Sequence, residues 1–390
     1  MTTYLFPGQG SQIKGMGNTL FDEFPKLTRK ADELLGYSIK ALCLDDENNL
    51  LHKTQYTQPA LYVVNALSYQ QKIKHMGKTP DFVVGHSLGE YNALQASGAF
   101  NFEMGLELVR KRGELMSQAA KGAMAAVLGM PEKNIKECLE TNHLNKIDIA
   151  NYNAPSQLVI SGLEEDISTA QTYFEKAGAL YIVLNTSGAF HSRQMASAKT
   201  QFEKYLKEFE FDDLQIPIIS NTHAKPYEQD KITQNLADQI DHSVKWSQSI
   251  QYLLERDEVE FEELGVGDVL KKLVKTIQQD FIAMEQNKKM IPSSTHTQSS
   301  QENEPEIANT TSVKSTEING RTSQKIETEA LHKSIIDWNN TFPIGTRVNV
   351  KGYEDKLRTS TCAKLLFGHR AAIYMDGYNG YFSLDDVTAV

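Results

Sequence analysis

The stretch Gly85-His86-Ser87-Leu88-Gly89-Glu90 decides the architecture that we expect for this chain. It follows the apolar run Phe82-Val83-Val84, typical of a buried strand, and precedes a helical pattern. A Gly-x-Ser-x-Gly sequence between a strand and a helix is typical of a nucleophile elbow, which holds the serine hydroxyl clear of the backbone. The turn is too sharp for side chains beside the serine, so Gly85 and Gly89 relieve the crowding. The layout predicts that Ser87 is a catalytic nucleophile rather than part of an ordinary loop.

Such a site needs two N–H groups to hold a developing oxyanion. The backbone N–H of Leu88, at the start of the helix, is expected to point to that position. A second glycine-rich loop, Pro7-Gly8-Gln9-Gly10-Ser11-Gln12, follows the predicted strand Thr3-Tyr4-Leu5-Phe6. It lacks the Lys-Ser/Thr pair of a phosphate-binding loop, so nucleotide binding is not expected there. Unless this loop is only a strand-to-helix turn, the N–H of Gln9 is the second donor.

A serine hydroxyl is a weak nucleophile and needs a base within hydrogen-bond reach. Of the ten histidines, His191 follows Gly188-Ala189-Phe190, a small-residue turn after a predicted strand, where α/β folds place catalytic groups. His86 neighbours the serine, but its side chain is expected to leave the elbow in another direction. No acidic residue stands out in the order used by α/β-hydrolases. We therefore interpret the pair as a dyad of Ser87 and His191 oriented by a backbone carbonyl.

Composition limits the other classes of function. The chain has 390 residues, enough for about two to three domains, and 40% of them are hydrophobic. The formal net charge of −10 argues against nucleic acid as a partner. The three cysteines are far apart and show no metal-binding spacing, so neither a metal site nor a disulfide framework is expected. With no signal sequence or membrane-length apolar run, we expect a soluble cytoplasmic protein.

The pattern changes after Gly122, and we expect an inserted subdomain over residues 122–187. Its predicted order, strand–helix–strand–strand–helix–strand, is typical of a ferredoxin-like unit. Residues 1–121 and 188–285 form the α/β core, with a parallel sheet and the elbow. In this core we expect further strands at Ile216–Ser220 and Phe261–Leu264 and a last helix at Val269–Ile277.

The C-terminal part differs in composition. Residues 286–330 are rich in Ser, Thr, Gln, Asn and Glu and poor in apolar residues, so we expect a disordered linker. Residues 331–390 contain alternating and strand-like segments around Asp376–Gly380, a hairpin signal, and predict a small β domain. An interaction role and a purely structural role both remain open for it.

Several motifs together resemble the malonyl-CoA:acyl carrier protein transacylases. Their order and spacing match that family over about residues 1–280, and the chain is most similar to the stand-alone acyltransferases of trans-acyltransferase polyketide synthases. One departure is Gly265-Val266-Gly267, where the family usually has Gly-Pro-Gly; we expect a small effect on that loop and none on the chemistry. The matching motifs are Phe6–Gln12, Gly85–Glu90, Arg112-Gly113, Asn151–Pro155, Gly188–Ser192 and Ser220–Tyr227.

The resemblance implies roles for individual residues. Ser87 is the nucleophile and His191 the general base and later the acid, with the N–H groups of Gln9 and Leu88 as the oxyanion hole. The guanidinium of Arg112 holds the free carboxylate of the malonyl group, a pairing that suits the planar, permanently charged fork of arginine. In the family a carbonyl near a Val-x-Trp stretch orients the histidine, which here points to the backbone carbonyl of Lys245.

The implied reaction is a ping-pong transfer from malonyl-CoA to the phosphopantetheine thiol of an acyl carrier protein, for polyketide or fatty-acid synthesis. The implied enzyme is an acyl-carrier-protein S-malonyltransferase with malonyl-CoA as donor and no bound cofactor. Phe190 stands where relatives that take methylmalonyl have serine, so its bulk is expected to exclude an α-branch. The alternative is an acyl hydrolase of the same fold that clears carrier proteins; in those relatives the arginine is usually replaced, so Arg112 argues against it.

Overall fold

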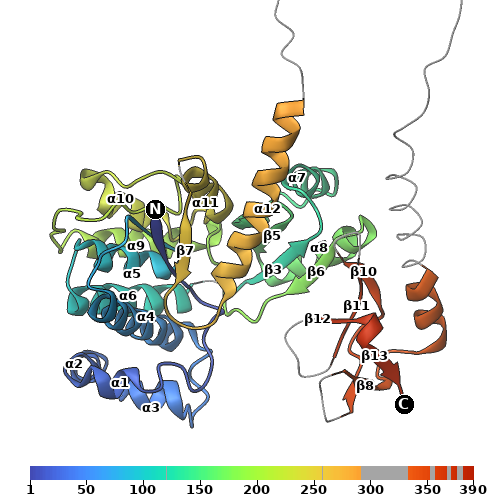
Figure 1. Cartoon of the computed structure of the whole chain (residues 1–390), viewed down its shortest axis with the longest axis horizontal. Coiled ribbons are helices and arrows are strands. Elements are labelled where there is room, and N and C mark those ends of the chain that lie inside the picture. The colour runs from blue at the N-terminus through green and yellow to red at the C-terminus, as the bar shows by residue number, and fades with distance from the viewer. Residues whose placement is uncertain (120, 257, 291–332, 352–355, 367–369, 376–380) are drawn as a thin grey trace, which may run out of the picture. The chain divides into compact units, whose positions relative to one another are not determined.

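The computed structural model describes residues 1–390 except 120, 257, 291–332, 352–355, 367–369 and 376–380. The chain divides into two compact units, Met1–Ile291 and Pro292–Val390 (Figure 1). Most of the predicted disordered linker, from residue 291 onward, lies outside the described residues. Within the described part of the chain, no helix has the length and apolar character needed to cross a membrane.

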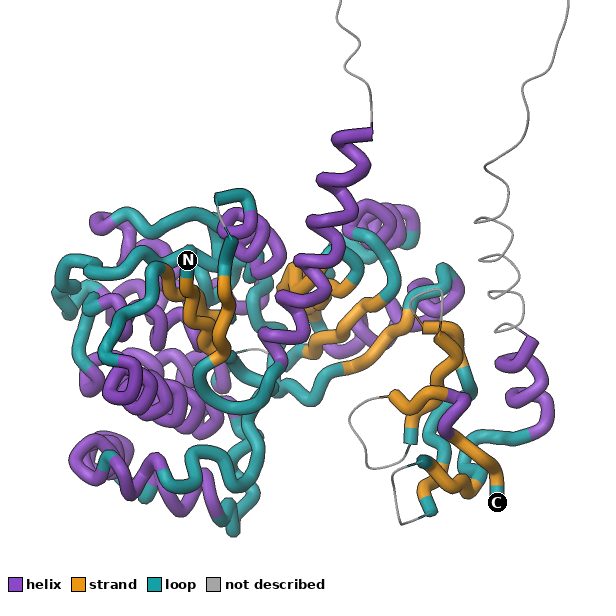
Figure 2. The backbone as a smooth tube through the Cα atoms, in the orientation of Figure 1, coloured by secondary structure: helices purple, strands orange, loops and turns teal. Residues whose placement is uncertain are grey.

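A parallel three-stranded sheet lies at the centre of the first unit (Figure 2). Its strands are β1 (Thr2–Phe6), β2 (Phe82–Gly85) and β7 (Glu260–Glu263), in the order β2-β1-β7. Both pairs are parallel, and Phe6 at the end of β1 is paired with Gly85 at the end of β2. This register brings the two glycine-rich loops together at one edge of the sheet, and the sheet confirms the predicted α/β fold.

Our prediction of a strand at Ile216–Ser220 is wrong. This segment makes only isolated bridges, Val83 with Ile218 and Ile219 with Pro226. Beside β2, the N–H of Val83 donates to the carbonyl of Pro217 at 3.1 Å. Proline has no N–H to return to a neighbouring strand, so a regular ladder cannot continue through Pro217.

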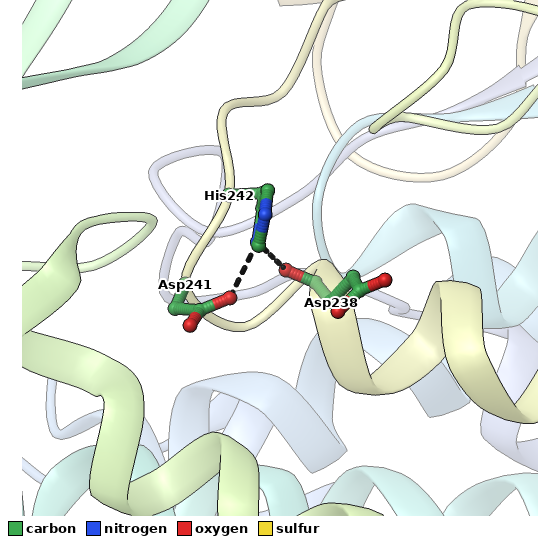
Figure 3. Close-up of side chains that lie close together, drawn as sticks. All are labelled: Asp238, Asp241 and His242. Atoms are coloured by element: carbon green, nitrogen blue, oxygen red, sulfur yellow. Dashed lines mark hydrogen bonds and ion pairs between the residues drawn. The ribbon is translucent and has the colours of Figure 1, made fainter.

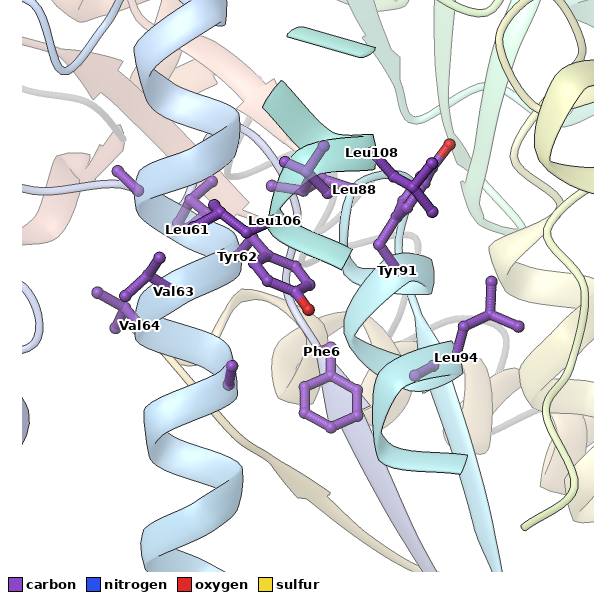
Figure 4. Packing of buried hydrophobic residues seen from close by; sticks show 14 of the residues in the cluster. Phe6, Leu61, Tyr62, Val63, Val64, Leu88, Tyr91, Leu94, Leu106 and Leu108 are labelled. Carbon is purple, nitrogen blue, oxygen red and sulfur yellow. The ribbon is translucent and has the colours of Figure 1, made fainter. Parts of the chain in front are cut away.

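Helices pack against the sheet, and their buried apolar side chains lie together with Phe6 of β1 (Figure 4). Most residues of the long helix α4 (Thr54–Met76) are buried between Thr54 and Tyr69. Its Leu61 and Tyr62 lie in the same cluster as Leu88 and Tyr91 from the elbow region and Leu106 from α6. The remaining helices are α1 (Leu20–Glu23), α2 (Pro25–Leu35), α3 (Ile39–Leu44), α5 (Gly89–Ser97), α6 (Phe102–Ser117), α9 (Ala196–Leu206), α10 (Ile232–Asp238) and α11 (Trp246–Leu254).

The last helix of the unit, α12, is longer than predicted. It runs from Val269 to Met290, beyond the expected end at Ile277, and Figure 1 shows its second half extending away from the sheet. Residues 286–290 are therefore helical, not part of a disordered linker. The preceding turn keeps both glycines: Gly265 has φ +129°, and a Cβ there would lie 2.0 Å from Asn65 Oδ1.

A four-stranded sheet is inserted between α6 and the loop that carries His191. Its order is β4-β5-β3-β6, and every neighbouring pair is antiparallel. Apolar side chains on one face of this sheet, with those of the helices of the insertion, form a cluster of their own, whereas Met124 and Val159 belong to the cluster of the main sheet. The elements are β3 (Ala123–Leu128), α7 (Glu132–Thr141), β4 (Asp148–Ala154), β5 (Gln157–Gly162), α8 (Glu164–Lys176) and β6 (Leu180–Val183).

The second unit contains two three-stranded antiparallel sheets, in the orders β10-β11-β12 and β13-β8-β9. A helix over residues 333–341 precedes them. Val348 and Ile373 belong to a small buried cluster of this unit. The turn of the predicted hairpin, residues 376–380, lies outside the described residues. The strands are β8 (Arg347–Val350), β9 (Leu357–Arg358), β10 (Lys364–Leu366), β11 (Arg370–Tyr374), β12 (Tyr381–Ser383) and β13 (Val387–Ala389).

Candidate active site

Ser87 lies in the turn between β2 and α5, with a positive φ of +51° that is rare for a residue with a side chain. A Cβ at Gly85 would lie 1.9 Å from the backbone carbon of Gly89, and a Cβ at Gly89 would lie 2.0 Å from the carbonyl oxygen of Phe6. Both distances are impossible for real atoms. The two glycines are therefore required by backbone packing against the serine turn and against β1.

The structure brings His191 to the serine. Ser87 Oγ and His191 Nε2 are 2.8 Å apart, and His191 is 4% exposed. Burial, together with the charge of Arg112, lowers the pKa of His191 to about 3. The imidazole is therefore neutral near pH 7, and Nε2 is free to accept the serine proton when Nδ1 carries the hydrogen.

The carbonyl that orients His191 belongs to Gln239, not to Lys245 as we predicted. His191 Nδ1 donates to the backbone oxygen of Gln239 at 2.8 Å. The carbonyl of Lys245 instead accepts the N–H of Ser249 at 3.0 Å and its hydroxyl at 2.8 Å, because Lys245 caps the first turn of α11. A capping carbonyl directed into its own helix is not available to the imidazole.

Arg112 reaches the serine from α6 and is 1% exposed. Its Nη2 donates to Gln239 Oε1 at 2.7 Å and to Ser87 Oγ at 3.2 Å. Its guanidinium carbon lies 5.5 Å from the ring centre of Tyr91. Burial lowers the pKa of Arg112, and its Nε has no hydrogen-bond partner in the described part of the chain. A buried cation with an unused donor is well suited to bind an anionic group.

A cavity of about 200 Å³ connects these groups. Gln9, Ser87, Arg112, Phe190 and His191 all line it. Its other lining residues include apolar side chains from the inserted sheet and from α12: Met124, Val159, Leu270 and Leu273. The pair of Ser87 and His191 and the buried cation therefore share one small, largely apolar cavity, of the kind in which electrostatic interactions are strong.

The two predicted oxyanion donors flank the serine. Within the described residues, the backbone N–H groups of Gln9 and Leu88 have no intramolecular acceptor. The loop of Gln9 is pressed against the elbow, since a Cβ at Gly8 would lie 2.3 Å from the carbonyl oxygen of His86. The Gln9 side chain is tied to Thr54 Oγ1 at 3.1 Å. Both N–H groups are thus held in place, but neither donates a hydrogen bond to another described residue.

Three residues that brace the elbow were not singled out from the sequence. Asn221 Oδ1 accepts the N–H of Ser87 at 2.7 Å, and its Nδ2 donates to the carbonyl of Gly85, also at 2.7 Å. The carboxyl group of Glu90 accepts the N–H of Asn221 at 2.8 Å, and Gln239 Nε2 donates to the carbonyl of Ser87 at 2.8 Å. Glu90 and Asn221 both fall in motifs that match the family, Gly85–Glu90 and Ser220–Tyr227, but the sequence did not indicate their contacts with the elbow.

His86 does not contact the nucleophile through its ring. Its Nε2 is 2.9 Å from Asn153 Oδ1, and its ring centre is 5.5 Å from that of Trp246. Burial lowers the pKa of His86. Its side chain leaves the elbow in another direction, as we predicted, and forms part of the cavity wall.

Asp238, Asp241 and His242 gather beside Gln239 at the end of α10 (Figure 3). Their potential ligand atoms lie within 4.8 Å of one another. However, Lys199 Nζ lies 2.6 Å from Asp238 Oδ1 and 3.2 Å from Asp241 Oδ1. The ammonium group pairs with both carboxylates, so the cluster ties α9 to the turn that carries Gln239.

Comparisons with known proteins show the family to which the chain belongs. Residues 3–303 match the acyl transferase domain family. A polyketide biosynthesis malonyl-CoA-acyl carrier protein transacylase of Bacillus velezensis is 59% identical over 282 residues, which span 72% of this chain and 98% of that protein. Another polyketide biosynthesis transacylase of this kind, from Bacillus subtilis, is 57% identical over 286 residues, spanning 73% of this chain and 99% of that protein.

Solved structures agree. The crystal structure of a malonyl-CoA-acyl carrier protein transacylase from Burkholderia pseudomallei has a TM-score of 0.70 and 53% identity, covering 72% of this chain and 98% of that one. A malonyl-transacylase solved in complex with a type II polyketide synthase acyl-carrier protein has a TM-score of 0.68 and 31% identity, covering 71% and 93%. The chain therefore belongs to the acyl transferase family and, within it, to the malonyl-CoA:acyl carrier protein transacylases.

Proposed function

We propose that this chain transfers a malonyl group from malonyl-CoA to the phosphopantetheine thiol of an acyl carrier protein, through a malonyl ester of Ser87. The observation that carries the proposal is the position of Arg112, which contacts Ser87 Oγ and keeps an unpartnered Nε inside the same buried region. A malonyl group has a thioester carbonyl at one end and a carboxylate at the other. Ser87 would attack the first while Arg112 binds the second.

In the first half-reaction, His191 Nε2 takes the proton of Ser87 as Oγ attacks the thioester carbon. The N–H groups of Gln9 and Leu88 stabilise the resulting oxyanion. As the carbon–sulfur bond breaks, the CoA thiolate takes the proton from His191, and malonyl remains esterified to Ser87. The bond from His191 Nδ1 to the carbonyl of Gln239 keeps the ring oriented through both proton transfers.

In the second half-reaction the carrier protein's thiol replaces CoA. His191 takes the thiol proton, and the sulfur attacks the ester carbon. The intermediate then expels Ser87 Oγ, which takes the proton back from His191. Neither step needs a bound cofactor, and the donor substrate is malonyl-CoA. Relatives named for polyketide biosynthesis support a role in that process, and relatives named without that qualifier leave fatty-acid synthesis as a second setting.

Phe190 supports a preference for malonyl over methylmalonyl. Its ring lines the cavity beside His191, and it is 5% exposed. A methyl branch on the acyl group would have to share that space. Because one methyl group changes binding by only about 1–3 kcal/mol, the preference is expected to be partial.

The arrangement also supports the predicted division of the first unit. We infer that residues 122–187 form a ferredoxin-like subdomain inserted into an α/β core of residues 1–121 and 188–285, whose last helix continues to Met290. The strand order β4-β5-β3-β6 and the separate apolar cluster support this inference. Residues 331–390 would form a separate small β domain with its own apolar cluster.

Intact-protein mass after brief exposure to malonyl-, methylmalonyl- and acetyl-CoA tests the proposed function, with Ser87→Ala as the control. We expect a malonyl adduct that requires Ser87 and that moves to an added phosphopantetheinylated carrier protein. An adduct formed mainly from acetyl-CoA and lost to water would identify the alternative, an acyl hydrolase.

A further inference from the structure

The side-chain amide of Gln239 contacts three groups, and only one orientation satisfies them all. The carbonyl oxygen of Ser87 and the carboxylate of Glu90 are acceptors, and both take hydrogens from Gln239 Nε2. Arg112 Nη2 can only donate, and it donates to Gln239 Oε1 at 2.7 Å. Rotating the amide by half a turn would place its NH₂ group against the guanidinium. The direction of this amide therefore decides whether Arg112 has an acceptor.

Glu90 is the group that can fix that direction. It is 1% exposed, on the first turn of α5. One carboxylate oxygen accepts from Gln239 Nε2, and the other accepts the N–H of Asn221 at 2.8 Å. The N–H of Asn221 and Nε2 of Gln239 are both donors, so Glu90 must offer an acceptor to each. Burial raises the pKa of Glu90 to about 7, and the bonds from Asn221 and Gln239, the hydroxyl of Tyr227 and the charge of Arg112 oppose that rise.

The neutral amide of Gln239 lies between the charged groups of Arg112 and Glu90, and this arrangement affects how Arg112 can bind an acid. Arg112 hydrogen-bonds to Gln239, and its Nε stays without a partner in the described part of the chain. A carboxylate bound directly to Arg112 would compete with an incoming acid for the same donors. With Gln239 between them, Glu90 still stabilises the cation at a distance while Arg112 keeps donors for the substrate.

We propose that Glu90 is a positioning residue for acid recognition: it fixes the amide of Gln239, which in turn holds Arg112 ready for the carboxylate of the acyl donor. This inference rests on the proposed function, because it assigns how the same site selects a donor with a distal carboxylate. Among the described residues, Glu90 hydrogen-bonds to neither the hydroxyl of Ser87 nor the imidazole of His191.

The test is Glu90→Gln, which keeps shape and size but replaces one acceptor with a donor. Rates of adduct formation on Ser87 are measured with malonyl-CoA and acetyl-CoA. We expect the malonyl-to-acetyl ratio of kcat/KM to fall by about tenfold to a hundredfold, mainly through a higher KM for malonyl-CoA. Glu114→Gln, the same change at a partly exposed position on α6, is the matched control and should keep the wild-type ratio.

Gln239→Met provides an independent variant, since it removes the amide but keeps similar volume. It should lower the same ratio, and adding Glu90→Gln to it should cause little further loss because both act through one contact. Equal losses with both donors, or an unchanged ratio in Glu90→Gln, would overturn the positioning role. If Glu90→Gln does not fold, an unchanged ratio in Gln239→Met overturns it by itself. Failure of the wild-type chain to prefer malonyl-CoA would instead reject the proposed function.

Discussion

The backbone oxygen of Gln239 accepts the hydrogen of His191 Nδ1 at 2.8 Å, so the imidazole beside Ser87 is oriented by the main chain and not by an acidic side chain. The same residue uses its side chain to contact Arg112 and the carbonyl of Ser87. Gln239 thus links the proposed base, the proposed acid-binding cation and the backbone of the proposed nucleophile. Substitutions at position 239 alter the side-chain contacts but retain the carbonyl.

Arg112 can be tested with two substitutions that separate charge from geometry. Arg112→Lys keeps the charge but loses the planar fork, and kcat/KM for malonyl-CoA should fall by about tenfold to a hundredfold. Arg112→Met also removes the charge and should fall further, while acetyl transfer becomes competitive. Competition between the two donors, read by intact mass, gives the ratio directly. Retention of the wild-type ratio in Arg112→Met would remove Arg112 from acid recognition.

Phe190→Ser tests the steric basis of donor choice. Removing the ring enlarges the cavity beside His191, and the ratio of methylmalonyl to malonyl transfer should rise by about tenfold or more. Parallel assays with the two CoA donors measure it. Equal rates with both donors in the wild-type chain would contradict selection by this side chain.

Gly89→Ala should destabilise the fold by more than about 2 kcal/mol, because its Cβ would lie 2.0 Å from the carbonyl oxygen of Phe6. The matched control is Gly162→Ala, whose Cβ would meet its nearest atom at an ordinary 3.4 Å. It should cost less than about 1 kcal/mol. Thermal and urea unfolding of both variants give the comparison. Equal stability of the two would mean that β1 shifts easily away from the elbow.

Malonyl selectivity should depend on pH through Glu90. Its pKa is raised by burial from 4.5 to about 7, so acidification through that range protonates it and turns one acceptor into a donor. The titratable groups that face it stay constant: Arg112 remains charged, and burial raises the pKa of Tyr227 well above its usual value. We expect the malonyl-to-acetyl ratio to fall below about pH 7 in the wild type but not in Glu90→Gln.

The same shift predicts the pH dependence of stability. Between about pH 4.5 and 7 the folded chain binds a proton at Glu90 that the unfolded chain does not, so the contribution to stability is present at low pH and is lost as the pH rises. The free energy of unfolding of the wild type, relative to Glu90→Gln, should therefore fall across this window. An opposite slope would place the folded pKa of Glu90 below its unfolded value.

The sequence predicts those parts of the site that are marked by a short motif of neighbouring residues. Gly85, Ser87 and Gly89 fall in a turn whose steric demands exclude larger residues, so spacing and strand–helix context predict the elbow. Gln239 could not be found this way, because a backbone carbonyl leaves no trace in residue type. Its choice over Lys245 depends on how α10 ends and α11 begins, which only the packed structure determines.

In the fold, too, the sequence predicts the elements that have a regular local pattern of apolar residues and not those that depend on contacts with distant segments. The elements after Gly122 follow the predicted order of strand, helix, strand, strand, helix and strand because their apolar patterns are regular. Ile216–Ser220 has strand-like residues, but Pro217 cannot complete a ladder next to β2. The second half of α12 has few apolar residues, so its hydrophobic pattern fades although Gln, Ala, Met, Glu and Lys favour a helix.

Gly122 lies directly against Ala189: a Cβ on the glycine would be 2.6 Å from that of the alanine and 3.0 Å from its backbone nitrogen. The chain therefore leaves the α/β core and returns to it within one close contact, and β4 is tied to the core again where the N–H of Val244 donates to the carbonyl of Ala150 at 2.8 Å. Met124 and Val159 of the inserted sheet line the same cavity as Ser87. A side chain at position 122 would push the two passing segments apart and would move this wall of the cavity with them.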